Sequence, residues 1–131
     1  MESLVEVDPL TEFFDAIKNP LTKNSYQKRL TLFFNYLKLE GDLKTQARTF
    51  AKKAKSDLLG TTAQVNEYMR SQKLRAEKGE ISENTLPNYF KPIKLFCEEN
   101  DIILNWKKIQ RRIPRGRNAA DDRIPTLDEI K

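Results

Sequence analysis

The residues in this sequence that are best suited to chemistry are its cations, because the residue types that support catalysis are almost absent. The chain contains no histidine and a single cysteine, Cys97. This composition removes the usual general base, the Ser-His and Cys-His nucleophile pairs, and zinc sites built from these side chains. The sequence also lacks a glycine-rich phosphate loop. We therefore predict that these residues form no catalytic centre and bind no cofactor or metal ion.

The net charge of +5 is distributed unevenly along the chain. Residues 21–117 carry 21 Lys and Arg against 10 Asp and Glu, a net charge of +11, whereas residues 1–20 carry five acidic residues and one lysine. Such a basic block favours a polyanion or an anionic membrane surface as partner. We favour nucleic acid, because the basic residues also cluster along the predicted helices.

The densest basic cluster lies between residues 107 and 117, where six of eleven residues are basic and none is acidic. These cations fall on a short helix and the linker after it, where they suit contacts to a phosphate backbone. The six are Lys107, Lys108, Arg111, Arg112, Arg115 and Arg117. A second basic ridge, Arg48, Lys52 and Lys55, follows the i, i+4, i+7 spacing of one helix face.

Two further groups of polar residues lie on predicted helices. The first is Lys23, Lys28 and Arg29, and the second is Asn84, Asn88, Lys91 and Lys94. Amides and cations on the polar face of a helix can read base edges and hold phosphates when the helix enters the major groove. We therefore predict that all four groups belong to a DNA-binding surface.

Apolar residues recur at helical spacing along most of the chain, and no useful stretch alternates as a strand requires. We predict an all-α bundle of about five to six helices, a kink at Pro92 and core positions for all four tyrosines. Caps and terminators place the first three helices from Pro9 to before Asn19, from Thr22 to Gly41, and from about Thr45 to Leu59, with Leu58 in the core and Gly60 as terminator. The other three run from the capping box Thr61–Gln64 to Gly79, from near Ser82 to Asn100, and from Trp106 to Arg112.

The chain is long enough for one domain, and we assign residues 1–113 to it. Residues 114–131 are predicted to be a linker and the first turn of a further domain, because Thr126–Glu129 forms a capping box beyond a stretch without apolar periodicity. The acidic start and the lack of an 18-residue apolar stretch predict a cytoplasmic protein with no membrane partner.

Three stretches, in this order, resemble the N-terminal core-binding, or SAM-like, domain of phage integrases and other tyrosine recombinases. They are LTKNSYQKRLTLFFNYLKLEG (residues 21–41), ISENTLPNYFKPIKLFCEENDI (81–102) and RNAADDRIPTLDEIK (117–131). The resemblance covers roughly residue 11 to the end. It implies a small helical bundle on one side of duplex DNA, joined by the linker to a catalytic domain on the other side.

The resemblance also implies that the parent protein integrates or recombines DNA with a catalytic domain outside this chain. In that family the catalytic arginines, lysine, histidines and tyrosine belong to the catalytic domain, and no residue here corresponds to them. We expect the isolated chain to be a monomer that meets other recombinase protomers in a synaptic complex. Two alternatives stay open: a helical protein-interaction module with a basic face, and an RNA-binding helical bundle.

Overall fold

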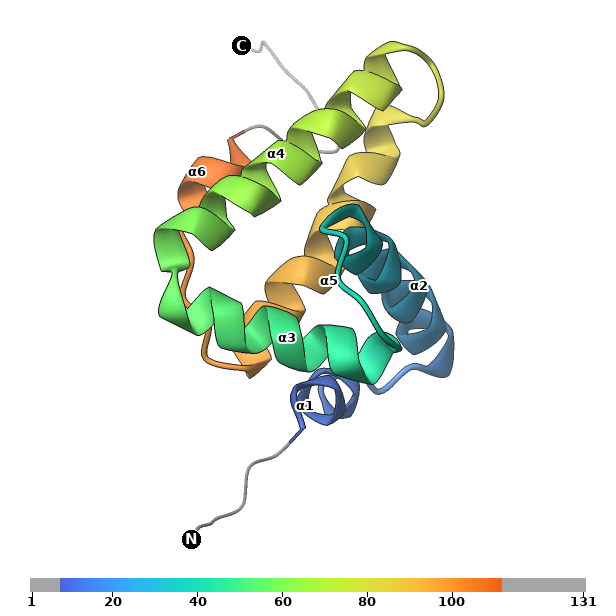
Figure 1. Ribbon diagram of the computed structural model, residues 1–131. Helices are drawn as coiled ribbons and strands as arrows, with labels where there is room; N and C mark the ends of the chain where they lie inside the picture. The colour runs from blue at the N-terminus through green and yellow to red at the C-terminus, as the bar shows by residue number, and fades with distance from the viewer. Residues whose placement is uncertain (1–7, 112–131) are drawn as a thin grey trace, which may run out of the picture.

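The computed structural model describes residues 8–111, which form six α-helices and one 3-10 turn without any strand (Figure 1). This confirms the predicted all-α fold. In chain order the elements are α1 (Pro9–Asp15), α2 (Pro20–Tyr36), α3 (Leu43–Ser56), α4 (Leu58–Glu77), the 3-10 turn η1 (Glu83–Thr85), α5 (Leu86–Glu99) and α6 (Trp106–Gln110). The predicted linker and the capping box Thr126–Glu129 lie outside the described residues.

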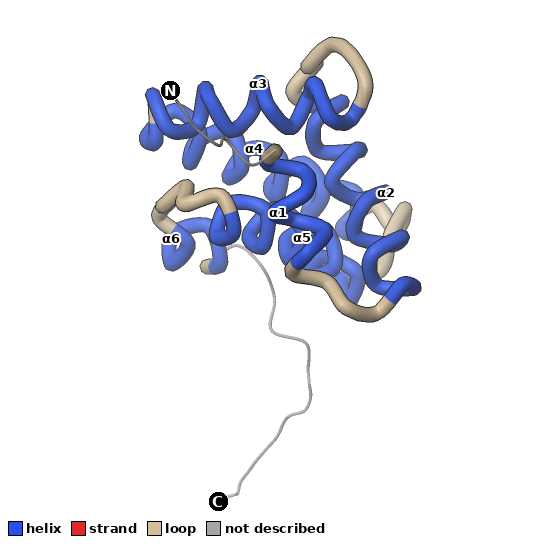
Figure 2. The backbone as a smooth tube through the Cα atoms, turned by 90° about the horizontal axis from the view of Figure 1, so that it is seen from below, coloured by secondary structure: helices blue, strands red, loops and turns tan. Residues whose placement is uncertain are grey.

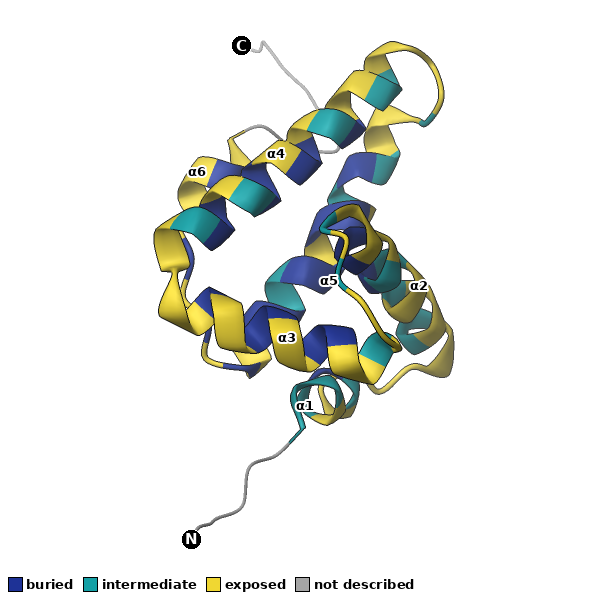
Figure 3. Cartoon of the chain, viewed as in Figure 1, coloured by how far each residue is buried: buried dark blue, intermediate teal, exposed yellow. Residues whose placement is uncertain are grey.

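Helix α5 runs through the centre of the bundle and contacts α1, α2 and α4 (Figures 1 and 2). Helix α3 contacts α1 and α4, and α6 lies against α4. Every helix thus buries one face and leaves the other face to solvent, as the alternation of buried and exposed ribbon in Figure 3 shows. Most of the predicted DNA-binding residues that the structure describes are exposed, whereas Lys23, Arg29 and Lys94 are half-buried.

Five phenylalanines fill the centre of the core, and each is at most 2% exposed: Phe13, Phe33, Phe34, Phe50 and Phe96. The ring of Phe50 lies 5.4 Å from Phe34 and 5.8 Å from Phe96, and Phe13 lies 5.9 Å from Phe96. These rings come from α1, α2, α3 and α5, so they join four helices. Burial of each such side chain contributes about 1.5–3 kcal/mol.

The tyrosines follow the core prediction with one exception. Tyr68 and Tyr89 are buried, and the half-buried Tyr26 packs against the core. Tyr36 is 44% exposed, so its predicted core position is wrong. It is the last residue of α2, and the centre of its ring lies 5.0 Å from the centre of the Tyr68 ring.

Helix α2 begins earlier than predicted. We expected Asn19 and Pro20 to end the first helix and Thr22 to cap the second. Instead Asn19 caps α2, because its side-chain oxygen accepts hydrogen bonds from the backbone N–H of Leu21 (2.8 Å) and Thr22 (3.3 Å). Pro20 fits the first helical position, where no backbone donor is needed. At its other end α2 stops at Tyr36, before the predicted terminator Gly41. Both Lys38 (φ 62°) and Gly41 adopt the left-handed backbone conformation.

The boundary between α3 and α4 also differs from the prediction. Helix α3 starts at its cap Asp42, not near Thr45, and ends at Ser56. Asp57 then caps α4 by accepting from the N–H of Gly60 at 2.9 Å, so Gly60 lies inside α4 and does not end α3. Thr61 is consequently buried in the helix and is not a cap, and Leu58, expected in the core, is 42% exposed.

The start of the fifth helix is a 3-10 turn. Ser82 caps this turn through its hydroxyl, and the N–H of Thr85 bonds to the carbonyl of Ser82 at 2.9 Å. Pro87 has no N–H to donate to the carbonyl of Glu83, so an α-helical ladder cannot start there. We predicted Asn84, Asn88 and Lys91 on one helix, but Asn84 lies in η1, before the start of α5. Helix α5 continues past Pro92 to Glu99.

Candidate nucleic-acid interface

Helices α2 and α5 are joined by a cation–π contact. The guanidinium carbon of Arg29 lies 4.5 Å from the centre of the Tyr89 ring. Tyr89 is 8% exposed and Arg29 is half-buried, so the ring forms a fixed support for a partly exposed cation. The Nη1 atom of Arg29 is buried and has no hydrogen-bond partner among the described residues. The contact with the Tyr89 ring therefore orients the Arg29 guanidinium.

We use the name α2–α5 surface for Lys28, Arg29, Asn88 and Lys91. Lys28, Asn88 and Lys91 are exposed. Helical spacing places Asn88 and Lys91 on the outer side of α5, opposite the buried Phe90 and Ile93 side, and Lys28 directly beside Arg29 on α2. Since α2 and α5 pack together, these four residues lie on two adjoining helices, which the Arg29–Tyr89 contact joins.

The remaining predicted residues of these helices are placed differently. Lys23 lies at the start of α2, where its Nζ is 5.9 Å from the Phe14 ring, and this position faces α1. Lys94 is half-buried, one turn beyond Lys91 on α5. Asn84 is exposed in η1. These three residues flank the α2–α5 surface and do not form it.

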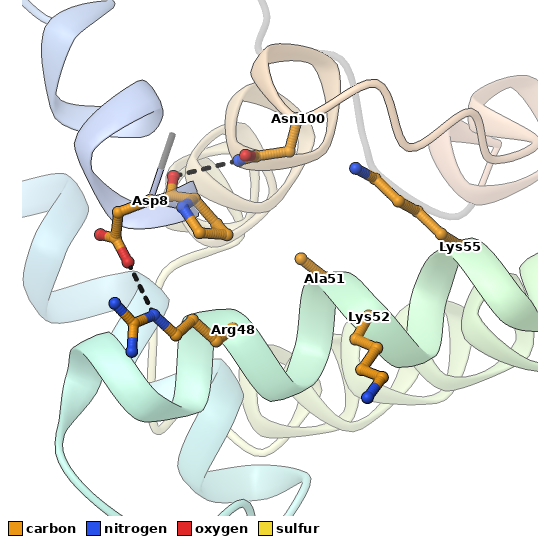
Figure 4. A pocket seen from close by; sticks show the side chains of 7 residues that line it. Asp8, Arg48, Ala51, Lys52, Lys55 and Asn100 are labelled. Carbon is orange, nitrogen blue, oxygen red and sulfur yellow. Dashed lines mark hydrogen bonds and ion pairs between the residues drawn. The ribbon is translucent and has the colours of Figure 1, made fainter. Parts of the chain in front are cut away.

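The ridge on α3 lines a cleft of about 710 Å³ between α3, the start of α1 and the end of α5 (Figure 4). We call this the α3 cleft. The side chains of Arg48, Lys52 and Lys55 are exposed, and Nε of Arg48 pairs with the Asp8 carboxylate at 3.1 Å. The complete lining is Asp8, Pro9, Arg48, Ala51, Lys52, Lys55 and Asn100.

A third basic group lies on α6, which Asn105 caps through the N–H of Lys108 at 3.2 Å. Lys107, Lys108 and Arg111 are exposed, while Ile109 is fully buried and anchors the helix. Trp106 packs edge-on against Phe90 of α5, with 5.7 Å between ring centres. The other members of the predicted cluster, Arg112, Arg115 and Arg117, lie outside the described residues.

The predicted cations therefore do not form one continuous group. Asn88 and Asn100 lie near opposite ends of α5, about 18 Å apart along the helix axis at 1.5 Å per residue. The α2–α5 surface is close to the first of these residues and the α3 cleft is lined by the second. Sequence spacing could place residues on one face of one helix, but it could not show which faces of different helices adjoin.

Three contributors to these surfaces were missed in the sequence. Tyr89 was assigned to the core alone, although its ring also carries Arg29. Asp8 was assigned only as a helix cap, although it also pairs with Arg48, 40 residues away. Arg75 of α4 was not predicted at all. Its hydrogen bond to Glu80 and a lesser one to Tyr89 raise its pKa, so it stays charged beside the α2–α5 surface.

Two titratable side chains in the core have shifted pKa values. Burial raises the pKa of the Cys97 thiol and of the Tyr68 hydroxyl, so both stay protonated at neutral pH. Among residues 8–111, no group of acidic, cysteine or histidine side chains is arranged to hold a metal ion. Within the same residues, no helix is long and apolar enough to cross a membrane.

Comparisons with known proteins leave the family open. No family model matches the chain, no curated protein is similar enough to count as a relative, and no solved structure matches the fold. The functional assignment consequently depends on the sequence pattern and on the geometry of the surfaces described above.

Proposed function

We propose that this chain is the DNA-gripping helical domain of a tyrosine-type site-specific recombinase, which binds duplex DNA through the α2–α5 surface. The observation that carries the proposal is the Arg29–Tyr89 contact, because it holds a partly exposed cation in place where α2 packs against α5. A cation ordered before binding loses little side-chain entropy when it meets a phosphate. Strand exchange would belong to a catalytic domain outside the chain.

The four residues of the surface have two proposed roles. Lys28 and Arg29 hold backbone phosphates, while Asn88 and Lys91 reach base edges in the major groove. Asn88 and Lys91 suit this role because an anchored helix presents both side chains on one exposed face. Lys107, Lys108 and Arg111 on α6 add phosphate contacts that do not depend on the sequence of the DNA.

The test is the affinity of the full chain for a short labelled DNA duplex, measured by fluorescence anisotropy. We expect the double variant Lys28→Ala/Lys91→Ala to bind roughly 10- to 100-fold more weakly, since it loses one phosphate contact and one base contact. Both side chains are exposed, so the fold should be unaffected.

The matched control is Lys53→Ala/Lys73→Ala, which removes the same charge from exposed positions of α3 and α4. An equal loss of affinity in both variants would mean that only total charge matters, and would contradict the assigned surface. Tighter binding of an RNA duplex or of an acidic peptide than of DNA would instead favour one of the two alternative functions.

A further inference from the structure

The α3 cleft is a concave, cationic feature that is separate from the α2–α5 surface. We propose that it holds backbone phosphates of a bound nucleic-acid strand, and that Asp8 competes with these phosphates for Arg48. This inference rests on the nucleic-acid binding proposed above, and it adds a second contact site with an internal competitor. Three cations against one carboxylate give the cleft lining a net charge of +2.

The spacing of the cations fits one strand. Arg48 and Lys55 lie seven residue steps apart on α3, about 10.5 Å along the axis, with Lys52 between them. Phosphates along one strand of a duplex rise by about 3.4 Å each, so this length covers roughly three phosphates. Figure 4 shows Lys55 extending toward the Asn100 side of the cleft and Lys52 lying along the outer side of α3.

The Arg48–Asp8 pair is fixed on the Asp8 side. The Asp8 carboxylate caps α1 by accepting from the N–H of Thr11 at 3.2 Å, and its side chain is only 15% exposed. The Arg48 side chain is 60% exposed and is free to turn toward a ligand. An exposed pair of this kind contributes at most about 1 kcal/mol, whereas a guanidinium can bind a phosphate through two parallel hydrogen bonds. A phosphate can therefore displace Asp8.

The lining of the α3 cleft favours a strand backbone over other anions. None of the seven described residues that line it is aromatic, so the cleft offers no surface on which a base could stack. Its apolar members are only Pro9 and Ala51, which give an acidic peptide no deep anchor. The wall is well ordered, since Nδ2 of Asn100 donates to the carbonyls of Pro9 (3.1 Å) and Phe96 (2.9 Å).

The first test is a salt titration of duplex binding with the variant Lys52→Ala/Lys55→Ala. Loss of two phosphate contacts should make the negative slope of log affinity against log salt shallower by about two. The control Lys53→Ala/Lys73→Ala removes the same charge outside the cleft, and its slope should stay close to that of the wild type. Equal slopes for the two double variants would overturn the proposal.

The second test removes the competitor and keeps the helix cap. Asn caps helices as well as Asp, so Asp8→Asn should retain α1 while Arg48 becomes free. We expect this variant to bind the duplex roughly two- to fivefold more tightly, which is the range an exposed ion pair allows. Circular dichroism would check that the helix content is unchanged. Unchanged or weaker binding by the folded variant would overturn the role of Asp8.

The outcomes separate this inference from the proposed function. If the wild-type chain does not bind duplex DNA, both proposals fall. If Lys28→Ala/Lys91→Ala weakens binding and Lys52→Ala/Lys55→Ala does not, only the cleft proposal falls. The cleft proposal would also be overturned if a polyglutamate peptide binds the wild type but not Lys52→Ala/Lys55→Ala, while DNA binding of this variant is unchanged. That result would favour a protein partner.

Discussion

At the scale of single residues, the ring of Tyr89 makes two kinds of contact. The ring packs in the core beside α2, and its face supports the Arg29 guanidinium at 4.5 Å. A partly exposed contact of this kind contributes about 0.5–1 kcal/mol. The helical spacing predicted the burial of Tyr89, but it could not predict the contact with Arg29, because the packing of α2 on α5 brings together residues 60 positions apart.

Cys97 provides a residue-level test of the core. It is fully buried, and burial, with a smaller contribution from Glu98, raises its pKa above the usual value of a thiol. The thiolate is therefore suppressed in the folded chain even at about pH 9, where an ordinary thiol is mostly ionised. We expect a thiol-specific chromogenic reagent to modify folded Cys97 at least tenfold more slowly than the unfolded chain. Equal rates in buffer and in denaturant would show that the thiol is accessible.

At the scale of helices, side-chain caps mark where five of the six described α-helices begin, and α5 begins after Thr85 without a side-chain capping hydrogen bond. The sequence predicted the existence of every described helix, but it placed the cap of α2 at Thr22 and the cap of α4 at Thr61. The structure uses an earlier residue each time, Asn19 for α2 and Asp57 for α4. Thr61 cannot serve, because the packing of α4 buries it, and burial depends on tertiary contacts that the local pattern does not contain.

The variant Asp57→Ala tests the α3–α4 junction. It removes the carboxylate that accepts from the N–H of Gly60, so the free energy of unfolding should fall by about 1 kcal/mol. Chemical denaturation followed by circular dichroism measures this difference. Asp57→Asn, which can still cap, is the matched control and should lose only a few tenths of a kcal/mol. If Asp57→Ala leaves the free energy of unfolding unchanged, the capping box at Thr61–Gln64 would be favoured instead.

At the scale of the whole molecule, most of the predicted DNA-binding residues that the structure describes lie in three regions: the α2–α5 surface, the α3 cleft and α6 with its C-cap Arg111. Composition and spacing predicted the residue types of all three regions and the helices that carry them. The arrangement of the regions depends on how the helices cross, so the sequence could not show that α5 separates the first two by about 18 Å along its axis. It also could not show that Asp8 partly neutralises the α3 ridge.

The central claim, binding of duplex DNA, is tested most directly by the salt dependence of the wild-type affinity. The affinity of the full chain for a random-sequence duplex would be measured between about 50 and 200 mM monovalent salt. If roughly four to six phosphates are neutralised, log affinity should fall against log salt with a slope of about −4 to −5. An affinity that does not change with salt, or no binding at the lowest salt concentration, would contradict the account.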